Sequence, residues 1–200
     1  DWRDMENRVK YDVTDLTSLE KLEPVRVRPG MYIGSTGTKG LHHCIWEILD
    51  NSIDEISNGY GNKASIILNK DKSVTIIDNG RGVPTGVHPI KKKTGVEMVY
   101  TELHTGGKFD NKNYKTSGGL HGVGAAVVNA LSEWLEVEVH QNGNIYRQRF
   151  EYAFDKELGK DMPGTAVTPL EIAGKSKDTG TRVTFKPSKE VFSTTDFKFD

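Results

Sequence analysis

The chain has 200 residues, with 27 basic and 28 acidic side chains and a formal net charge of −1. This length is sufficient for one domain with its own hydrophobic core, and the balanced charge gives the surface as a whole no electrostatic attraction for nucleic acid. The single cysteine, Cys44, excludes an internal disulfide and a cysteine cluster for zinc. No apolar run is long enough to cross a membrane, so we expect a cytoplasmic protein with no membrane contact.

The first part of the chain is predicted to be an arm. Residues 1–22 are mostly polar and charged, and they lead into a short helix that we expect to end within Val25–Gly30, because Pro-Gly favours a turn. We therefore divide the chain into an arm, residues 1–22, and one domain, residues 23–200, which we expect to be part of a longer protein.

The remaining elements follow from periodicity and turn signals. Apolar residues at helical spacing predict helices over residues 39–59, 94–103 and 122–133, and alternating residues predict strands over 64–68, 74–77, 135–140, 145–152 and 181–185. Residues 104–121 are predicted to form a long loop, and residues 155–180 to be irregular. Because short turns join the strands, we predict an α+β fold, a two-layer sandwich of a mainly antiparallel mixed sheet with helices on one face.

Glycines crowd the stretch Gly118–Gly124, and an apolar run follows at once. Glycine lets backbone N–H groups approach a ligand, and the start of a helix offers unpaired donors, so this pattern favours a phosphate-binding loop. The alternative is an ordinary surface loop. The spacing matches neither the P-loop nor the dinucleotide-binding fingerprint, whose glycine order is reversed here.

Glu47, Asn51 and Glu55 recur every four residues and form one polar stripe on the first long helix. The amide oxygen of Asn51 suits Mg²⁺, and Glu47 could accept a proton from a water aimed at a phosphate. His43, one turn earlier, could orient Glu47 through a hydrogen bond. An ordinary solvated helix face is the alternative.

Asp78 ends a buried strand and is followed by Gly80 and Gly82. An ionised carboxylate accepts hydrogen bonds, so Asp78 suits the amino group of adenine, although a tight turn is the alternative. Further contributions to this pocket are expected from an ion pair between Arg81 and Glu55, an apolar rim at Pro84, a water bridge at Thr181, and donors at Lys108 and Tyr114.

Taken together, these motifs resemble those of a known family. The pattern Glu47-x-x-x-Asn51, Asp78-x-Gly80-x-Gly82, Gly119-x-x-Gly122-x-Gly124 and Gly180-Thr181 resembles that of the GHKL ATPases, which include gyrase, Hsp90, sensor histidine kinases and MutL. Over about residues 11–200, the segments Arg28–Gly34, Leu41–His43, Gly106–Phe109 and Tyr114–Gly124 are similar to the amino-terminal ATPase domain of bacterial type II topoisomerase B subunits.

The resemblance implies a role for each matching residue. Glu47 would be the general base, assisted by His43, and Asn51 would hold Mg²⁺ beside ATP. Asp78 and Thr181 would bind adenine, and Tyr114 and, across a dimer, Tyr11 would contact the nucleotide. The phosphates would be wrapped by Gly106, Gly107, Lys108, Leu120, His121, Gly122, Val123 and Gly124. The pocket used by aminocoumarin-type inhibitors would be lined by Arg81, Pro84 and Arg147, and Glu55 and Gly82 also belong to the expected nucleotide-binding residues.

The resemblance also implies partners. ATP binding would drive homodimer closure through the arm, and the full assembly would add a topoisomerase A-type subunit (ParC or gyrase A) and duplex DNA. A lysine that reaches the γ-phosphate comes from the next domain in this family, so we expect weak hydrolysis by this chain alone. Residues 114–117 and 132–135 favour the topoisomerase IV form (ParE), whereas Phe109-Asp110 is more typical of gyrase. The sequence also allows a histidine-kinase-like phosphotransfer domain or a non-catalytic nucleotide sensor.

Overall fold

The computed structural model describes residues 18–103 and 124–199. Seven strands form one sheet in the order β1-β2-β7-β3-β4-β5, with β6 pairing with β4 off this path. The strands are β1 (Ala64–Leu68), β2 (Val74–Asp78), β3 (Ser132–Gln141), β4 (Asn144–Asp155), β5 (Lys160–Ala166), β6 (Glu171–Lys175) and β7 (Gly180–Pro187). Every pairing between these strands is antiparallel.

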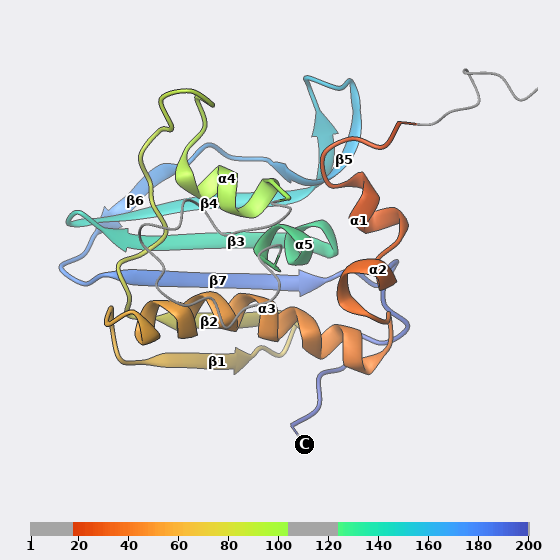
Figure 1. Cartoon of the computed structure of the whole chain (residues 1–200), viewed down its shortest axis with the longest axis horizontal. Helices are drawn as coiled ribbons and strands as arrows, with labels where there is room; N and C mark the ends of the chain where they lie inside the picture. Colours follow the sequence, from red (N-terminus) through yellow and green to blue (C-terminus); the bar gives the residue numbers. More distant parts are fainter. Residues whose placement is uncertain (1–17, 104–123, 200) are drawn as a thin grey trace, which may run out of the picture.

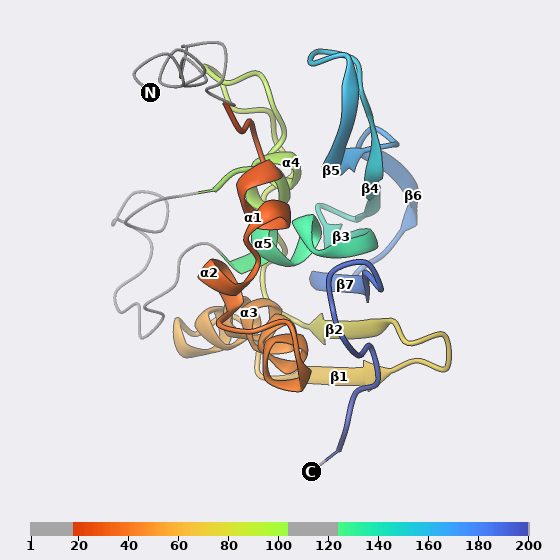
Figure 2. The ribbon, with the colours of Figure 1, turned by 90° about the vertical axis from the view of Figure 1, so that its right-hand side faces the viewer.

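The helices lie together on one face of the sheet, as the two perpendicular views show (Figures 1 and 2). They are α1 (Glu23–Val27), α2 (Gly30–Ile33), α3 (Thr38–Ser57), α4 (Gly95–Thr101) and α5 (Gly124–Ala130). The predicted two-layer α+β sandwich is confirmed, and the described strands form an antiparallel sheet. Across residues 18–103 and 124–199, no helix combines the length and the apolar character needed to cross a bilayer.

The core lies between the two layers. The inward-facing residues of β3 alternate with outward-facing ones, and Leu135, Val137 and Val139 are fully buried. The short helix α5 is buried along most of its length beneath α3 and α4, and its residues Val127 and Val128 join the same core cluster. Leu22, at the end of the predicted arm, is also buried in this core.

Helix α3 ends as its sequence predicts. Gly59 has φ +88°, a conformation that a side chain disfavours, and its N–H donates to the carbonyl of Ile56. The N–H of Tyr60 donates to the carbonyl of Glu55. These two bonds form a Schellman motif, which turns the chain back so that Tyr60 lies beside the last turn of the helix.

Three predictions about elements were wrong. Residues 160–166 and 171–175, predicted to be irregular, form β5 and β6, because pairing with β4 outweighs the weak strand propensity of a segment that contains Pro163 and Gly164. Gly30 starts the short helix α2 where only a turn was expected, whereas α1 ends at Val27, within the range predicted for its end. The helix predicted to reach residue 133 ends at Ala130, because β3 begins at Ser132.

Candidate functional site

The carboxylate of Glu47 is buried in the middle of α3 and paired with a histidine. Glu47 is 5% exposed, and its Oε1 lies 2.7 Å from Nε2 of His43, one helical turn earlier. The histidine side chain remains 35% exposed, so the pair joins the interior to the surface. The predicted contact between His43 and Glu47 is present.

The same carboxylate meets the end of the glycine-rich stretch. A Cβ atom added to Gly124, the first residue of α5, would lie 2.2 Å from Oε2 of Glu47. Such a contact is impossible without displacement, so only glycine lets the start of α5 lie directly against Glu47. The predicted phosphate loop therefore ends beside the predicted base.

Asp78 lies where β2 ends and accepts hydrogen bonds at both of its oxygens. Oγ of Ser52, a buried residue of α3, donates to Oδ2 at 2.7 Å, and the N–H of Gly80 donates to Oδ1 at 2.9 Å. A carboxylate offers about four acceptor positions, so it can accept further bonds from a ligand. Thr181 is the direct cross-strand neighbour of Asp78, which brings the two predicted adenine-binding residues together.

Tyr100 of α4 is buried in the neighbourhood of Asp78. Burial is the main cause that raises the pKa of its hydroxyl, and the negative charge of Asp78 adds to the effect. The phenol therefore stays protonated and neutral at physiological pH. Burial also raises the pKa of the Cys44 thiol, on α3, to about 12, so Cys44 is a core residue and not a nucleophile.

One wall of the site is built from Glu55 in the last turn of α3, Tyr60 just beyond that helix, and Arg81 in the turn after β2. Arg81 donates to both carboxylate oxygens of Glu55, from Nη2 at 2.7 Å and from Nε at 3.2 Å, and its backbone N–H also reaches Glu55 at 3.0 Å. The guanidinium carbon lies 3.7 Å from the ring centroid of Tyr60. The predicted pairing of Arg81 with Glu55 is present, and the aromatic ring adds a cation–π contact.

The turn that follows β2 is fastened to the neighbouring strands. Gln141 at the end of β3 donates from Nε2 to the carbonyls of Arg81 and Gly82, at 3.2 and 3.3 Å. Oγ1 of Thr181 accepts from the N–H of Val83 at 3.1 Å, which leaves its hydroxyl proton available for another acceptor. Pro84 is exposed at the outer end of this turn, as an apolar rim requires.

Asn51 is an exposed residue of α3, one turn beyond Glu47 and one turn before Glu55. Its amide oxygen is a hard donor of the type that Mg²⁺ accepts. Within the described ranges, no group of three or more His, Cys, Asp or Glu side chains could form a protein-only metal cage. A single amide oxygen therefore fits a cation that takes its remaining ligands from phosphate and water.

The structure does not bring Arg147 to the other predicted residues. Asp78, Thr181 and Val139 are directly paired across three neighbouring strands, so their side chains share one face of the sheet. Arg147 is paired with Glu138, the residue that precedes Val139. Side chains alternate along a strand, so Arg147 lies on the face of the sheet opposite Asp78, where it pairs with Glu138 at 3.0 Å. Hydrogen bonds from Arg147 and His140 outweigh the effect of burial and lower the pKa of Glu138.

Several predicted residues lie outside the described residues, and the structure does not place them. They are Tyr11, Gly106, Gly107, Lys108, Tyr114, Leu120, His121, Gly122 and Val123.

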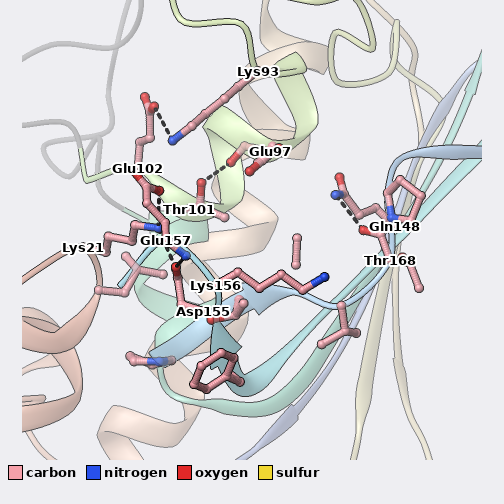
Figure 3. A pocket seen from close by; sticks show the side chains of 18 of the residues that line it. Lys21, Lys93, Glu97, Thr101, Glu102, Gln148, Asp155, Lys156, Glu157 and Thr168 are labelled. Carbon is pink, nitrogen blue, oxygen red and sulfur yellow. Dashed lines mark hydrogen bonds and ion pairs between the residues drawn. The ribbon is translucent and has the colours of Figure 1, made fainter. Parts of the chain in front are cut away.

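A separate hollow of about 800 Å³ lies between α4, the turn that joins β4 to β5, and the start of the described chain (Figure 3). Its charged walls are held by ion pairs, including Lys21 with Asp155 at 2.5 Å and Lys91 with Glu102 at 2.9 Å. None of the predicted site residues lines it. This hollow is therefore distinct from the site on α3.

Sequence reasoning missed Ser52, Tyr60, Tyr100 and Gln141. Ser52 follows Asn51 directly, yet its partner Asp78 is 26 residues away, so no local pattern announces the bond. Tyr60 could have been inferred, because Gly59 predicts a helix end that folds the next residue back over the last turn.

Comparison with known proteins agrees with this arrangement. Residues 36–191 match the model of the family described as histidine kinase-, DNA gyrase B-, and HSP90-like ATPase. The B subunit of DNA topoisomerase 4 from Staphylococcus epidermidis (strain ATCC 12228 / FDA PCI 1200) is 54% identical over 197 residues, and that from Staphylococcus aureus (strain MW2) is 55% identical over the same length. Each match covers 98% of this chain but only 28% of the relative.

A solved structure matches as well. The crystal structure of the 43K ATPase domain of Thermus thermophilus gyrase B in complex with an aminocoumarin superposes with a TM-score of 0.73 at 42% identity. The match covers 89% of this chain and 42% of that one. The chain therefore belongs to the family of histidine kinase-, DNA gyrase B- and HSP90-like ATPases, whose fold and ATP-binding function it shares.

Proposed function

We propose that this chain is the ATPase domain of a type II DNA topoisomerase B subunit, in which ATP binding closes a homodimer and drives the passage of one DNA duplex through another. The family match, the topoisomerase relatives and the arrangement of the site support this proposal. The chain spans only 28% of those relatives, so strand passage would require parts of the enzyme beyond the matched region.

The observation that carries the proposal is the position of Glu47. Its carboxylate is buried, held by His43 at 2.7 Å, and in contact with Gly124 at the end of the glycine-rich stretch. A base in that position could take a proton from a water next to a phosphate bound by the loop. Oε1 of the carboxylate contacts His43, and Oε2 lies next to Gly124, on the side where the phosphates are proposed to bind.

Asp78 and Thr181 supply the proposed adenine end of the site. The carboxylate of Asp78 would accept from the amino group of adenine, since Ser52 and Gly80 occupy only part of its accepting capacity. The backbone at Gly82 and the wall formed by Glu55, Arg81 and Tyr60 would line the flat faces of the base. Pro84 would complete the rim, and aminocoumarin-type inhibitors would occupy this end.

Asn51 would hold Mg²⁺, which neutralises charge on the phosphates when bound. The exposed amide fits this role, because it lies one turn from Glu47 and the rest of the coordination can come from phosphate and water. We further propose that the phosphates are surrounded by Gly106, Gly107, Lys108 and residues 120–123. Tyr114 would contact the nucleotide of its own subunit, and Tyr11 would contact the nucleotide of the second copy across the dimer. Electrostatic stabilisation of the transferred phosphoryl group would be the main catalytic effect.

Topoisomerase IV is favoured over gyrase as the parent enzyme. The staphylococcal topoisomerase 4 relatives are 54–55% identical to the chain, whereas the matching gyrase B structure is 42% identical. The proposed partners are accordingly an A-type subunit, a second copy of the chain and duplex DNA. No observation on the described residues favours phosphotransfer to a protein histidine.

The test uses this chain and a chimera in which it replaces the matching region of the B subunit of Staphylococcus aureus topoisomerase 4, assembled with that enzyme's A subunit. Glu47→Gln should lower the kcat for ATP by at least about 100-fold in the chimera while ATP binding stays within about threefold, because the side chain keeps its shape and loses its basicity. Decatenation of linked DNA circles should fall in parallel.

Glu171→Gln, an exposed residue of β6, is the matched control and should leave both activities unchanged. Normal turnover by the Glu47→Gln chimera would disprove the role of the base. A chimera that hydrolyses ATP but never decatenates DNA would disprove the assignment to topoisomerases while leaving the ATPase intact.

A further inference from the structure

The segment after β7 runs back across the start of α3, which places the end of the described chain beside that helix (Figures 1 and 2). Phe192 is buried, and the N–H of Ser193 donates to the carbonyl of Thr36 at 3.0 Å, two residues before the helix begins. Asp196 pairs with Lys72, in the turn between β1 and β2, at 2.7 Å. The segment is therefore fixed to the domain at several points before it reaches α3 itself.

Its contact with α3 is made by His42. The rings of His42 and Phe197 stack with centroids 5.9 Å apart and planes inclined by 7°. The backbone N–H of Lys198 donates to Nε2 of His42 at 3.2 Å. Nε2 of His42 is therefore the acceptor in this hydrogen bond. A stacked ring and a directed hydrogen bond together fix both the position and the orientation of the imidazole.

His42 directly precedes His43, which holds the carboxylate of Glu47 at 2.7 Å. Both histidines belong to α3, so a displacement of one is transmitted to the other through helical backbone. The segment 192–198 and the His43–Glu47 pair are thus joined by one rigid element. The proposed ATP site makes no use of His42, which leaves its two contacts with the tail as its visible function.

We infer that His42 is a positioning residue that couples the tail at Phe197 and Lys198 to the His43–Glu47 pair. A pull on the tail by a domain attached to it would act on the first turns of α3 and so on the alignment of the base. This inference rests on the proposed role of Glu47, and it adds that the alignment of the base depends on the part of the enzyme attached beyond the tail. Such a dependence would affect turnover and leave ATP binding nearly unchanged, because Ser52 and Glu55, the α3 residues that contact Asp78 and Arg81, lie ten or more positions beyond His42.

The experiment compares variants in the same chimera and in the isolated 200-residue chain. His42→Ala should lower kcat for ATP by about tenfold in the chimera, with KM changed by less than about twofold. His42→Gln keeps an acceptor without the ring, and His42→Phe keeps the ring without the acceptor, so each should recover part of the loss. Lys198→Ala is the matched control, because the bond comes from the backbone N–H, and it should be silent.

A double-mutant cycle with Phe197→Ala separates coupling from local damage. If the two residues act as one contact, His42→Ala should have little further effect on kcat once Phe197 is removed. A chimera with His42→Ala that keeps the wild-type kcat, or effects of the two substitutions that simply add, would overturn the inference. So would a loss of nucleotide affinity in the isolated chain as large as the loss of kcat in the chimera.

Glu47→Gln is assayed in the same series, so that the two proposals fail separately. Normal turnover with Glu47→Gln would refute the role of Glu47 as the general base, and with it the reason to expect an effect of His42 on turnover. A large loss with Glu47→Gln and none with His42→Ala refutes only the coupling. Thermal unfolding of each chimera confirms that the compared proteins are folded, and His42→Gln and His42→Phe carry the test if His42→Ala is not.

Discussion

Oγ of Ser52 lies 2.7 Å from Oδ2 of Asp78. Helix α3, which carries the predicted general base Glu47, therefore also orients Asp78, the residue predicted to bind adenine. Ser52 is buried, and α3 packs directly against β2. A single helix therefore sets the distance between the two ends of the proposed ATP site. Substitutions at different positions of α3 can therefore test the phosphate end, at Glu47, and the adenine end, at Asp78, one at a time.

We predict that Ser52→Ala weakens ATP binding without changing turnover. The substitution removes one neutral donor to a partly buried carboxylate and costs about 1–1.5 kcal/mol, which corresponds to a five- to tenfold higher Kd for ATP. Isothermal titration of the purified chain with ATP would measure the change. Ser57→Ala, at the exposed end of the same helix, is the control and should bind ATP like the wild type.

We predict that His43→Ala lowers turnover without weakening ATP binding, the reverse of the effect expected for Ser52→Ala. His43 contacts Glu47, and it lies nine residues before Ser52, the α3 residue that contacts Asp78. Its loss should therefore lower kcat by about tenfold or more and change KM by less than about threefold. Steady-state ATP hydrolysis by the chimera checks both numbers. A variant whose KM rises while its kcat is normal would show that His43 binds substrate and does not orient the base.

The local parts of the site were predictable from the sequence, and the long-range parts were not. Helical spacing placed Glu47, Asn51 and Glu55 along one helix, and strand-ending signals placed Asp78 at the end of a strand. Each of these inferences uses residues within a few positions of one another.

The errors at β5, β6 and Arg147 involve pairing between distant segments. Strand β5 pairs with β4 although it contains Pro163 and Gly164, and only the register with β4 defines it as a strand. The register likewise places Arg147 opposite Glu138, on the other face from Asp78, and register is invisible in a single sequence. Resemblance to a family could name Arg147, but it could not say which way the strand presents it.

The contact between Gly124 and Glu47 predicts that Gly124→Ala impairs turnover. The new Cβ would lie 2.2 Å from Oε2, so the carboxylate or the start of α5 must move by more than an ångström. We expect kcat in the chimera to fall by about tenfold or more, because small displacements of reacting groups are costly. Gly30→Ala is the control, since a Cβ there meets no atom within 4 Å, and it should leave kcat unchanged.

The last prediction concerns acid stability at the root of the predicted arm. Lys21 donates to the nearly buried carboxylate of Asp155 at 2.5 Å, and the N–H groups of Glu157 and Leu158 donate to its other oxygen. Burial opposes ionisation, but the bonds from Lys21 and from the two N–H groups outweigh it, so the pKa of Asp155 lies below its ordinary value of 3.8.

A carboxylate with a lowered pKa stabilises the fold above its ordinary value of 3.8, and this contribution is lost as the pH falls through the lower value in the folded state. We therefore expect Asp155→Asn to lower the free energy of unfolding by about 1–3 kcal/mol at pH 7 and by progressively less as the pH falls below about 4. Urea unfolding of the isolated chain at pH 7, 5 and 3 measures both free energies. The control is Asp178→Asn at an exposed position, whose free energy of unfolding should match that of the wild type at every pH. If the difference in free energy of unfolding between Asp155→Asn and the wild type stayed constant across this range, the ion pair would contribute nothing that depends on protonation.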